Sequence, residues 1–257
     1  MTRTLRVIDT GLKPAHWNIA VTAALIEQHV DGRIADTLRF HRYRPAVLIG
    51  RNQRFAEACD VRACRRHGVD VARRITGGGA VYMTPGVLAF DLVIGRRVAG
   101  DQEHAASTIC QALARGLSRL DATGRLVARY RAPNDIVIAG RKVVGASGYY
   151  DGTTLAYQGA IMIDMDFAMM AEVLVLPAPL DGQLTCLREQ AGPAADRNAL
   201  TGFVTGELTQ VFGYAAAPDD LDEATMQIAE RMLVDGMGDA EDHPPGRASH
   251  PMQEQAS

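Results

Sequence analysis

The sequence of 257 residues lacks the marks of several protein classes. Its four cysteines are irregularly spaced and too few for the disulfide framework of a chain this long, which indicates a reducing, cytoplasmic setting. No apolar run reaches the length of a membrane span, and the first residues are not an apolar signal segment. A formal net charge of −3 leaves no basic footprint for nucleic acid. We therefore expect a cytoplasmic protein that binds neither membranes nor nucleic acids.

Lysine is nearly missing. The 27 basic residues comprise 25 arginines and only two lysines, Lys13 and Lys142. An ammonium is a compact point charge on a flexible stem, whereas a guanidinium is a planar fork, so the two are not interchangeable. Lys142 also lies in a glycine-rich segment, "NDIVIAGRKVVGASG". We interpret it as a functional residue; the alternative is a lysine retained by chance on an exposed strand.

The hydrophobic pattern predicts one α+β domain over residues 1–235, with a mixed or mostly antiparallel sheet packed with helices. Strands are expected at 4–9, 37–43, 46–51, 69–75, 80–83 and 87–95, followed by an antiparallel meander at 134–139, 142–147, 153–158 and 160–166. Helices are expected at 14–30, 54–68, 102–120, 167–174, 197–212 and 221–234. Residues 236–257 are polar and carry three prolines, so this tail is expected to be disordered.

Three consecutive glycines, Gly77 to Gly79, lie between the predicted strands "VARRIT" and "AVYM". No Lys-Ser/Thr pair follows them, and the next element is a strand, so the segment is neither a Walker A loop nor a dinucleotide fingerprint. Bare main-chain N–H groups can form an anion-binding concavity, and a guanidinium beside them suits a phosphate or carboxylate. Arg73 and Arg74 would point in opposite directions on a strand, so only one can face that ligand. A β-bulge or hairpin with two solvated arginines is the alternative.

The segment "APNDIVIAGRKVVGASG" predicts a hairpin that turns at Ala139 and Gly140. Asn134 and Asp135 follow Pro133 at the start of its first strand. A short polar side chain at that place can point at a ligand or a metal. The alternative is that the pair only initiates a turn.

Two other clusters are weaker candidates for a metal site. Cys59, Cys64 and His67 lie on one predicted helix at spacings of five and three, which do not present three ligands tetrahedrally. Asp164 and Asp166 share one face of a strand, where solvated carboxylates are the simpler interpretation. Neither cluster is expected to hold a metal.

Taken together, "RRITGGGAVY", "NDIVIAGRKVVGAS" and "YQGAIMIDMDF" resemble, in order and approximate spacing, the motifs of lipoate–protein ligases of the biotin/lipoate ligase superfamily. The resemblance covers residues 5 to 235, and "TCLREQ" with the helix at 197–212 also fits. It implies the form that lacks a fused C-terminal accessory domain. It also implies an ATP-dependent enzyme that forms lipoyl-AMP and pyrophosphate, and then passes the lipoyl group to a lysine of an acceptor domain.

The resemblance further implies roles for individual residues. Lys142 is the catalytic cation between the carboxylate and the α-phosphate, and it is not the nucleophile. Asp135 helps to hold Mg²⁺, and Asn134 orients the phosphate. The other residues expected to bind ATP or lipoate are Arg74, Thr76, Gly77, Gly78, Gly79, Ala80, Val81, Tyr82, Gly145, Gln158 and Gly159. The dithiolane tail needs an apolar slot, for which the helix at 14–30 and the strand "AVLIG" are the expected walls.

The expected substrates and cofactors are therefore ATP, Mg²⁺ and lipoate. The expected partner is a lipoyl-domain acceptor: the E2 subunit of a 2-oxoacid dehydrogenase, a glycine-cleavage H-like carrier or a specialised lipoate-binding protein. A separate small accessory subunit, docked on the helix at 221–234, is expected to close over the site and protect the acyl-adenylate from water.

Two positions depart from the family's pattern. After "GGGAV" the family commonly has an aromatic residue and a histidine, whereas this chain has Tyr82 and Met83, and Gln158 replaces a further histidine. These changes leave the preferred acyl chain open. The rival function is an ATP-independent octanoyl or lipoyl transferase that acts through a cysteine thioester. Residues 134–165 contain no cysteine, and Cys186 is the only one near the later motifs. A non-catalytic lipoyl-binding paralogue is a third alternative.

Overall fold

The computed structural model describes residues 3–176 and 182–240. Its largest element is an eight-stranded sheet in the order β11-β1-β2-β6-β10-β9-β8-β7. β1 pairs in parallel with β2 and β11, and the other pairs of this sheet are antiparallel, so the predicted mixed sheet is confirmed. The strands are β1 (Arg3–Lys13), β2 (Thr37–Tyr43), β6 (Val87–Gly95), β7 (Ala128–Arg131), β8 (Asp135–Ile138), β9 (Arg141–Asp151), β10 (Thr154–Met162) and β11 (Tyr214–Pro218).

A second, three-stranded sheet has the order β4-β3-β5. It consists of β3 (Ala46–Ile49), β4 (Asp70–Arg73) and β5 (Val81–Met83). β3 lies in the middle, parallel to β4 and antiparallel to β5. The triple-glycine segment therefore joins two strands that do not pair with each other, which rules out the simple hairpin considered from the sequence.

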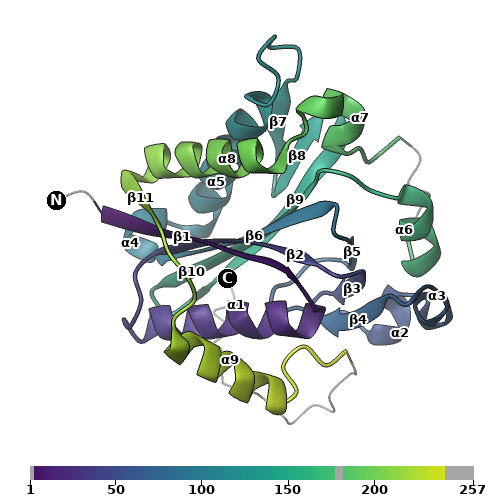
Figure 1. The fold of residues 1–257 in the computed structure, drawn as a ribbon, viewed down its shortest axis with the longest axis horizontal. Coiled ribbons are helices and arrows are strands. Elements are labelled where there is room, and N and C mark those ends of the chain that lie inside the picture. Colours follow the sequence, from purple (N-terminus) through teal and green to yellow (C-terminus); the bar gives the residue numbers. More distant parts are fainter. Residues whose placement is uncertain (1–2, 177–181, 241–257) are drawn as a thin grey trace.

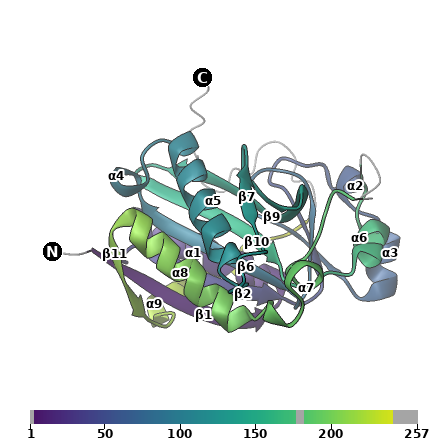
Figure 2. The same ribbon diagram turned by 90° about the horizontal axis from the view of Figure 1, so that it is seen from above.

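Helices cover both faces of the large sheet (Figure 1, Figure 2). α5 (Gln102–Ser118) and α8 (Arg197–Phe212) lie on one face, where Phe90 of β6 and Ile109 belong to the same buried cluster. α1 (Ala15–Val30) and α9 (Glu223–Val234) lie on the other face, where Val93 of β6 packs in a cluster with Leu25. β6 is consequently buried from Val87 to Ile94, as expected for a strand covered on both sides.

The small sheet packs beside α1, over the other end of the same face of the large sheet (Figure 1). Three short helices accompany it: α2 (Phe55–Ala58), α3 (Val61–His67) and α6 (Phe167–Val173). A buried cluster joins the two sheets and includes Leu48 and Tyr82 from the small sheet and Val87, Ala89 and Met162 from the large one. The space between the sheets contains the site described below.

Several predicted elements differ from the observed ones. The helix expected at 54–68 is split into α2 and α3, because Cys59 is extended and bridges to Leu174, while the Asp60 carboxylate caps α3. The strands expected at 153–158 and 160–166 are one strand, β10. The prediction missed β7, β11, α4 (Arg96–Ala99), α7 (Leu187–Ala191) and the 3₁₀ turn Gly192–Ala194.

The polar tail expected from residue 236 onward lies mostly outside the described residues. Its first part, residues 236–240, is described and packs on the small sheet: Met237 and Ala240 contact the buried cluster there. The main-chain N–H of Arg73 donates to the Gly238 carbonyl, and Nη2 of Arg73 donates to the Ala240 carbonyl. Within the described residues, no helix combines the length and apolar character that crossing a membrane requires.

Candidate active site

A cavity of about 380 Å³ lies between the two sheets. It brings together most of the residues selected from the sequence. The predicted residues that line it are Arg74, Thr76, Gly77, Gly78, Gly79, Ala80, Val81, Tyr82, Lys142, Gly145, Gln158 and Gly159. Asn134 and Asp135 do not line it, but Asp135 contacts Lys142 at its mouth. Three motifs that are distant in the sequence therefore meet at one site.

The floor of the cavity is a row of small residues that crosses four strands of the large sheet. Gly145 of β9 pairs with Ala160 of β10, Ala160 pairs with Ala89 of β6, and Ala89 pairs with His41 of β2. Residues in register on neighbouring strands point to the same face. The row therefore forms a trough that starts beside Lys142 and ends at His41.

Arg74 shapes the glycine segment. Its Nη2 donates to the carbonyls of Gly77 and Gly79 at 2.7 and 2.8 Å, and its Nη1 donates to the Leu48 carbonyl at 2.9 Å. Burial lowers the pKa of Arg74 to about 10, so the guanidinium remains charged at neutral pH. Arg73 is not among the residues that line the cavity and instead bonds main-chain carbonyls including that of Gln53, so only one of the two arginines faces the cavity, as predicted.

The three glycines are needed for different reasons. Gly78 has φ +92°, and a Cβ on it would lie 3.1 Å from Nη2 of Arg74, so packing and backbone conformation both select glycine there. A Cβ on Gly50 would collide with the Gly78 carbonyl, which shows how closely the loop approaches β3. Gly77 and Gly79 have no positive φ, and no atom of the described residues lies within 4 Å of an added Cβ. Internal packing does not explain glycine at these two positions, whereas the approach of a ligand would.

Lys142 reaches the cavity through an irregularity in the predicted hairpin. The turn at Ala139 and Gly140 is confirmed, and both residues have positive φ. The β8–β9 register then shifts, so that one residue of β9, Val143, is left over. Without this bulge, Lys142 and Gly145 would face opposite sides of the sheet, because their spacing is odd. With it, a Cβ on Gly145 would lie 2.9 Å from the Lys142 ammonium, so the lysine lies over Gly145.

Two carboxylate contacts hold the mouth of the site. Oδ1 of Asp135 lies 2.6 Å from the Lys142 Nζ, and its Oδ2 accepts from Nη2 of Arg131 at 3.0 Å. Both oxygens are engaged by cations, and the described residues bring together no group of three His, Cys, Asp or Glu side chains that could hold a metal. The residues present do not fit a Mg²⁺ site made by the protein alone, and the metal role of Asp135 stays a prediction.

Two hydrogen bonds hold Asn134 in place. The hydroxyl of Tyr157 donates to Oδ1 of Asn134 at 3.1 Å, and the Asn134 carbonyl accepts from the main-chain N–H of Ala146. Because Oδ1 is already an acceptor for Tyr157, the amide nitrogen is the group that Asn134 can offer as a donor. A donor suits the predicted contact with a phosphate oxygen.

The apolar wall of the cavity differs from the prediction. Leu48 of the strand "AVLIG" lines it as expected, but no residue of α1 does. Instead, methionine and leucine side chains from α6 and its flanking segments close this side: Met165, Met170, Leu174, Leu176 and Leu184. The expected α1 wall is wrong because a buried polar network stands between that helix and the cavity.

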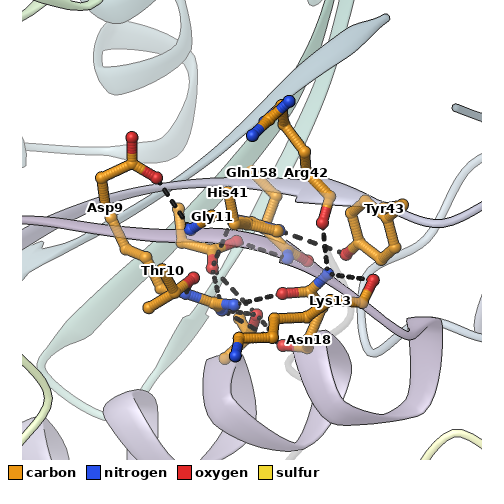
Figure 3. A network of polar contacts seen from close by, with 12 residues as sticks. Asp9, Thr10, Gly11, Lys13, Asn18, His41, Arg42, Tyr43 and Gln158 are labelled. Carbon is orange, nitrogen blue, oxygen red and sulfur yellow. Dashed lines mark hydrogen bonds and ion pairs between the residues drawn. The ribbon is translucent and has the colours of Figure 1, made fainter. Parts of the chain in front are cut away.

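This network joins α1 to β2, β6 and β10 (Figure 3). Nη1 of Arg39 lies 3.0 Å from Oδ2 of Asp91, and both side chains are fully buried. Oδ2 of Asp91 also accepts from the Thr22 hydroxyl of α1, and its Oδ1 accepts from Nε2 of Gln158 at 2.8 Å. Arg39 additionally donates to Asn18 and Thr10, the latter on β1. Burial raises the pKa of Asp91, and its ion pair with Arg39 opposes that shift.

His41 and Tyr43 line the cavity next to this network, and both were missed from the sequence. Nε2 of His41 lies 3.2 Å from the Tyr43 hydroxyl. Burial and the nearby Arg39 charge hold the pKa of His41 well below 6.5, so its ring is neutral at neutral pH. The signal was a period of two: the polar side chains of Arg39, His41 and Tyr43 recur at every second position along a strand, so they share one face of it.

No cysteine lines the cavity among the described residues. All four cysteines are buried, and burial raises the pKa of Cys64 to about 12 and that of Cys110 to about 11. Cys186 belongs to a segment that lies beside Lys142 in the fold, since Leu184 bridges to Lys142, but Cys186 is 2% exposed and packs in the cluster between the sheets. A thiolate nucleophile therefore has no candidate among the cavity residues.

Comparison with known families agrees with this geometry, because the model of the lipoyl protein ligase A/B catalytic domain matches residues 14–207. The chain belongs to this family. The matched residues include every predicted site residue and the whole small sheet, whereas β1 and β11 of the large sheet lie outside the match.

Individual relatives in the family carry two kinds of name. Octanoyltransferase LipM of Moorella thermoacetica is 26% identical over 249 residues, which cover 86% of this chain and 90% of that protein. Lipoate-protein ligase LplJ of Bacillus subtilis is 31% identical over 127 residues, or 49% of this chain and 37% of that protein. The chain is thus similar to both transferases and ligases.

Solved structures show the same fold. A bipartite lipoate protein ligase of Thermoplasma acidophilum, described together with its E2 lipoyl domain, has a TM-score of 0.77 at 21% identity, with 91% of this chain and 92% of that chain covered. A lipoate-protein ligase A bound with ATP also has a TM-score of 0.77 at 21% identity, with coverages of 91% and 95%. The predicted α+β ligase-like architecture is confirmed.

Proposed function

We propose that this chain is an ATP-dependent lipoate–protein ligase. In the first step a lipoate carboxylate oxygen attacks the α-phosphorus of ATP, which forms lipoyl-AMP and releases pyrophosphate. In the second step a lysine amine of an acceptor domain attacks the lipoyl carbonyl, which forms an amide and releases AMP. The observation that carries the proposal is the cation at the mouth of a cavity that contains no thiol among its described lining residues.

The charge of Lys142 suits the first step. Two anions, a carboxylate and a triphosphate, must approach each other, and a cation between them lowers their repulsion and stabilises charge that develops at phosphorus. The ammonium carries three donors and uses one towards Asp135, so it can reach substrate oxygens as well. Asp135 holds the ammonium over Gly145, at the start of the small-residue trough.

The glycine segment suits the nucleotide and the acyl-adenylate. The open space above Gly77 and Gly79 lets a ligand lie against the main chain, and the Arg74 guanidinium beneath keeps the loop in one shape. Leu48 and the apolar side chains of α6 and its flanks form a slot for the acyl tail. Bound Mg²⁺ would neutralise charge on the phosphates, but the proposal is not supported by any Mg²⁺ site that the described side chains form.

A second candidate is the octanoyltransferase activity for which the M. thermoacetica relative is named, and the length of that match favours it. A transferase that works through a thioester needs a cysteine within reach of the acyl carbonyl. The four buried cysteines of this chain do not meet that need, which is why we place the ligase first.

One experiment separates the two candidates. The purified chain is assayed for lipoate-dependent exchange of labelled pyrophosphate into ATP. A ligase shows exchange, because adenylate formation is reversible. Transfer of an octanoyl group from a carrier protein without ATP, together with an acyl-enzyme sensitive to hydroxylamine, would instead establish the transferase. A lipoyl-binding paralogue would show neither reaction.

For the second step we propose a lipoyl domain as acceptor, on the model of the T. acidophilum ligase described with its E2 lipoyl domain. A separate accessory subunit that docks at α9 (Glu223–Val234) remains part of the proposal, since lid closure protects a hydrolysable adenylate. Full exchange and acceptor lipoylation by the chain alone would remove the need for it. Transfer from synthetic lipoyl-adenylate with failed exchange would support it.

A further inference from the structure

The row of small residues in the cavity floor continues beyond Gly145 as a row of charged side chains. Gly145 of β9 pairs with Asp135 of β8, and Asp135 pairs with Arg131 of β7. Residues directly opposite each other on neighbouring strands share one face of a sheet. Arg131 and Asp135 therefore lie on the face that forms the cavity floor, just outside the cavity itself. Arg131 was not among the residues selected from the sequence.

The carboxylate of Asp135 bridges two cations, each of which has an oxygen of its own. Oδ1 lies 2.6 Å from Nζ of Lys142, and Oδ2 accepts from Nη2 of Arg131 at 3.0 Å. The central carboxylate is the least exposed of the three side chains, at 24% against 33% for Lys142 and 49% for Arg131. An isolated ion pair on a protein surface contributes little, whereas charges that form a network can contribute more.

The charges of this row decide how strongly Lys142 attracts an anion. Lys142 and Asp135 alone would be a neutral pair, and an anionic substrate would have to compete with the full charge of the carboxylate for the ammonium. Arg131 supplies a second cation, so the three groups together keep one net positive charge. Since the carboxylate then attracts two cations on two different oxygens, Lys142 stays in place without losing its attraction for a second anion.

We propose that Arg131 is a positioning residue of this site and that it acts through Asp135. The guanidinium holds Oδ2 and offsets the charge of the carboxylate, so that Oδ1 keeps the Lys142 ammonium over Gly145 while the ammonium remains available to a substrate. Arg131 itself touches no reacting atom in this scheme. The inference rests on the proposed function, because it takes the carboxylate of the acid substrate to bind at Lys142.

Titration calorimetry with lipoic acid and lipoamide tests the proposal without ATP or acceptor. The two compounds have the same tail, but lipoamide has a neutral amide in place of the carboxylate. Arg131→Gln should weaken the binding of lipoic acid about fivefold and leave that of lipoamide unchanged, because only the charged compound competes with Asp135 for Lys142. The loss should shrink at high salt, which screens partly exposed charges. Equal weakening of both compounds, or unchanged binding of lipoic acid, would overturn the proposal.

Further variants separate this role from a general effect of charge. Arg131→Lys keeps the cation and should bind lipoic acid within about twofold of the natural protein. Arg129, on the same face of β7, is exposed and makes no ion pair within the described part of the chain, so Arg129→Gln is the matched control and should also keep its affinity. An equal loss in Arg129→Gln would assign the effect to overall charge and refute the proposal.

A double variant tests whether Arg131 acts through Asp135. In Asp135→Asn no carboxylate charge remains to be offset, so the further change Arg131→Gln should alter the binding of lipoic acid by less than about twofold. A loss as large as in the natural background would mean that Arg131 attracts the ligand directly, which contradicts the proposal. If the natural protein binds neither lipoic acid nor lipoamide, the proposed function itself fails, and this outcome differs from a defect confined to the Arg131 variants.

Discussion

Two cation–carboxylate pairs flank the cavity, and they differ in every respect except their charges. Arg39 and Asp91 are fully buried, and Arg39 is tied in addition to Asn18 and Thr10. Lys142 and Asp135 lie at the mouth, where the lysine side chain is 33% exposed and the aspartate 24%. In the first pair, the donors of Arg39 are bonded to other protein groups. In the second pair, Lys142 retains donors that a substrate can use.

The comparison shows that a short ion-pair distance does not by itself mark a functional site. The buried guanidinium of Arg39 joins α1 to the large sheet through several hydrogen bonds, and removal of either partner of its ion pair leaves an uncompensated buried charge. An ammonium with one carboxylate partner at an opening can exchange that partner for an anionic substrate. The following experiments test whether the buried pair contributes mainly to stability and the pair at the mouth mainly to activity.

The largest effect is expected from Lys142→Ala. We expect lipoate-dependent pyrophosphate exchange to fall by about a thousandfold, while the unfolding midpoint in urea stays close to that of the natural protein. Lys142→Arg should also lose most activity, because a planar fork cannot occupy the same point between two anions. If Lys142→Arg retains the exchange rate of the natural protein, the assigned role is wrong.

Arg39→Met should show the opposite behaviour. Removal of one partner leaves Asp91 buried without its countercharge, so we expect the free energy of unfolding to fall by about 3–5 kcal/mol. The double variant Arg39→Met with Asp91→Leu should recover part of this loss, because no uncompensated charge remains. Urea unfolding of the two variants and the natural protein measures both effects. Equal stability of Arg39→Met and Lys142→Met would contradict the distinction between the two pairs.

Two substitutions in the glycine segment distinguish an effect on stability from an effect on ligand binding. Gly78→Ala forces a residue with a side chain into φ +92° against Arg74, and should cost about 1–2 kcal/mol of stability. The added Cβ of Gly79→Ala meets no atom within 4 Å in the part of the chain that the structure describes, so stability should be unchanged, but the KM for ATP or lipoate should rise. Thermal unfolding and exchange kinetics of the two variants give the answer. An unchanged KM for Gly79→Ala would favour a structural turn over a binding loop.

A smaller effect is expected in the pH dependence of stability, and it tests whether His41, which lies beside the buried Arg39–Asp91 pair, is neutral. The pKa of His41 is well below 6.5 in the folded protein, because of burial and then the Arg39 charge. As the pH falls below 6.5 the unfolded chain takes up a proton that folded His41 does not, so this residue lowers stability on the acid side. Compared with His41→Leu, the natural protein should lose up to about 1.4 kcal/mol more per pH unit below 6.5. Parallel pH profiles of the two proteins would disprove a neutral His41.

The smallest effect is expected from the cysteines. Single replacements at Cys59, Cys64, Cys110 and Cys186 by alanine should each keep substantial exchange activity, since none lines the described cavity. Mass spectrometry of the protein after incubation with acyl donors provides the control. Loss of activity at Cys186 together with an acyl group trapped on that residue would establish the transferase.

The sequence predicted the parts of the site that depend on local chemistry. The triple glycine, the turn at Ala139 and Gly140 and the candidate residue Lys142 could each be selected from a few neighbouring residues, and the structure brings the glycine segment and Lys142 together at one cavity. The parts it missed depend on tertiary contacts. The bulge at Val143 is visible only in the pairing of β8 with β9, and the partner of Arg39 lies 52 residues away on β6.

The same reason explains the errors in the fold. The split of the expected helix at Cys59 follows from a bridge to Leu174, which no local pattern encodes. β11 is a short edge strand, Tyr214–Pro218, that follows the C-terminal end of α8 and, among the described strands, pairs with β1 alone. The first helix was expected to wall the cavity from its apolar face, and a polar network assembled from three other elements prevents this.

The segment after α9, residues 236–240, is linked through hydrogen bonds to the residue that precedes Arg74 and the triple-glycine loop. Arg73 donates from its main chain to the Gly238 carbonyl and from its side chain to the Ala240 carbonyl, while the next residue, Arg74, holds the triple-glycine loop. Residues 236–240 and the triple-glycine loop are therefore held by two adjacent residues, Arg73 and Arg74, at the end of β4. Coupling between two sites acts equally in both directions, so a contact at residues 236–240 that changes the affinity of the loop for a ligand is itself changed by that ligand by the same factor.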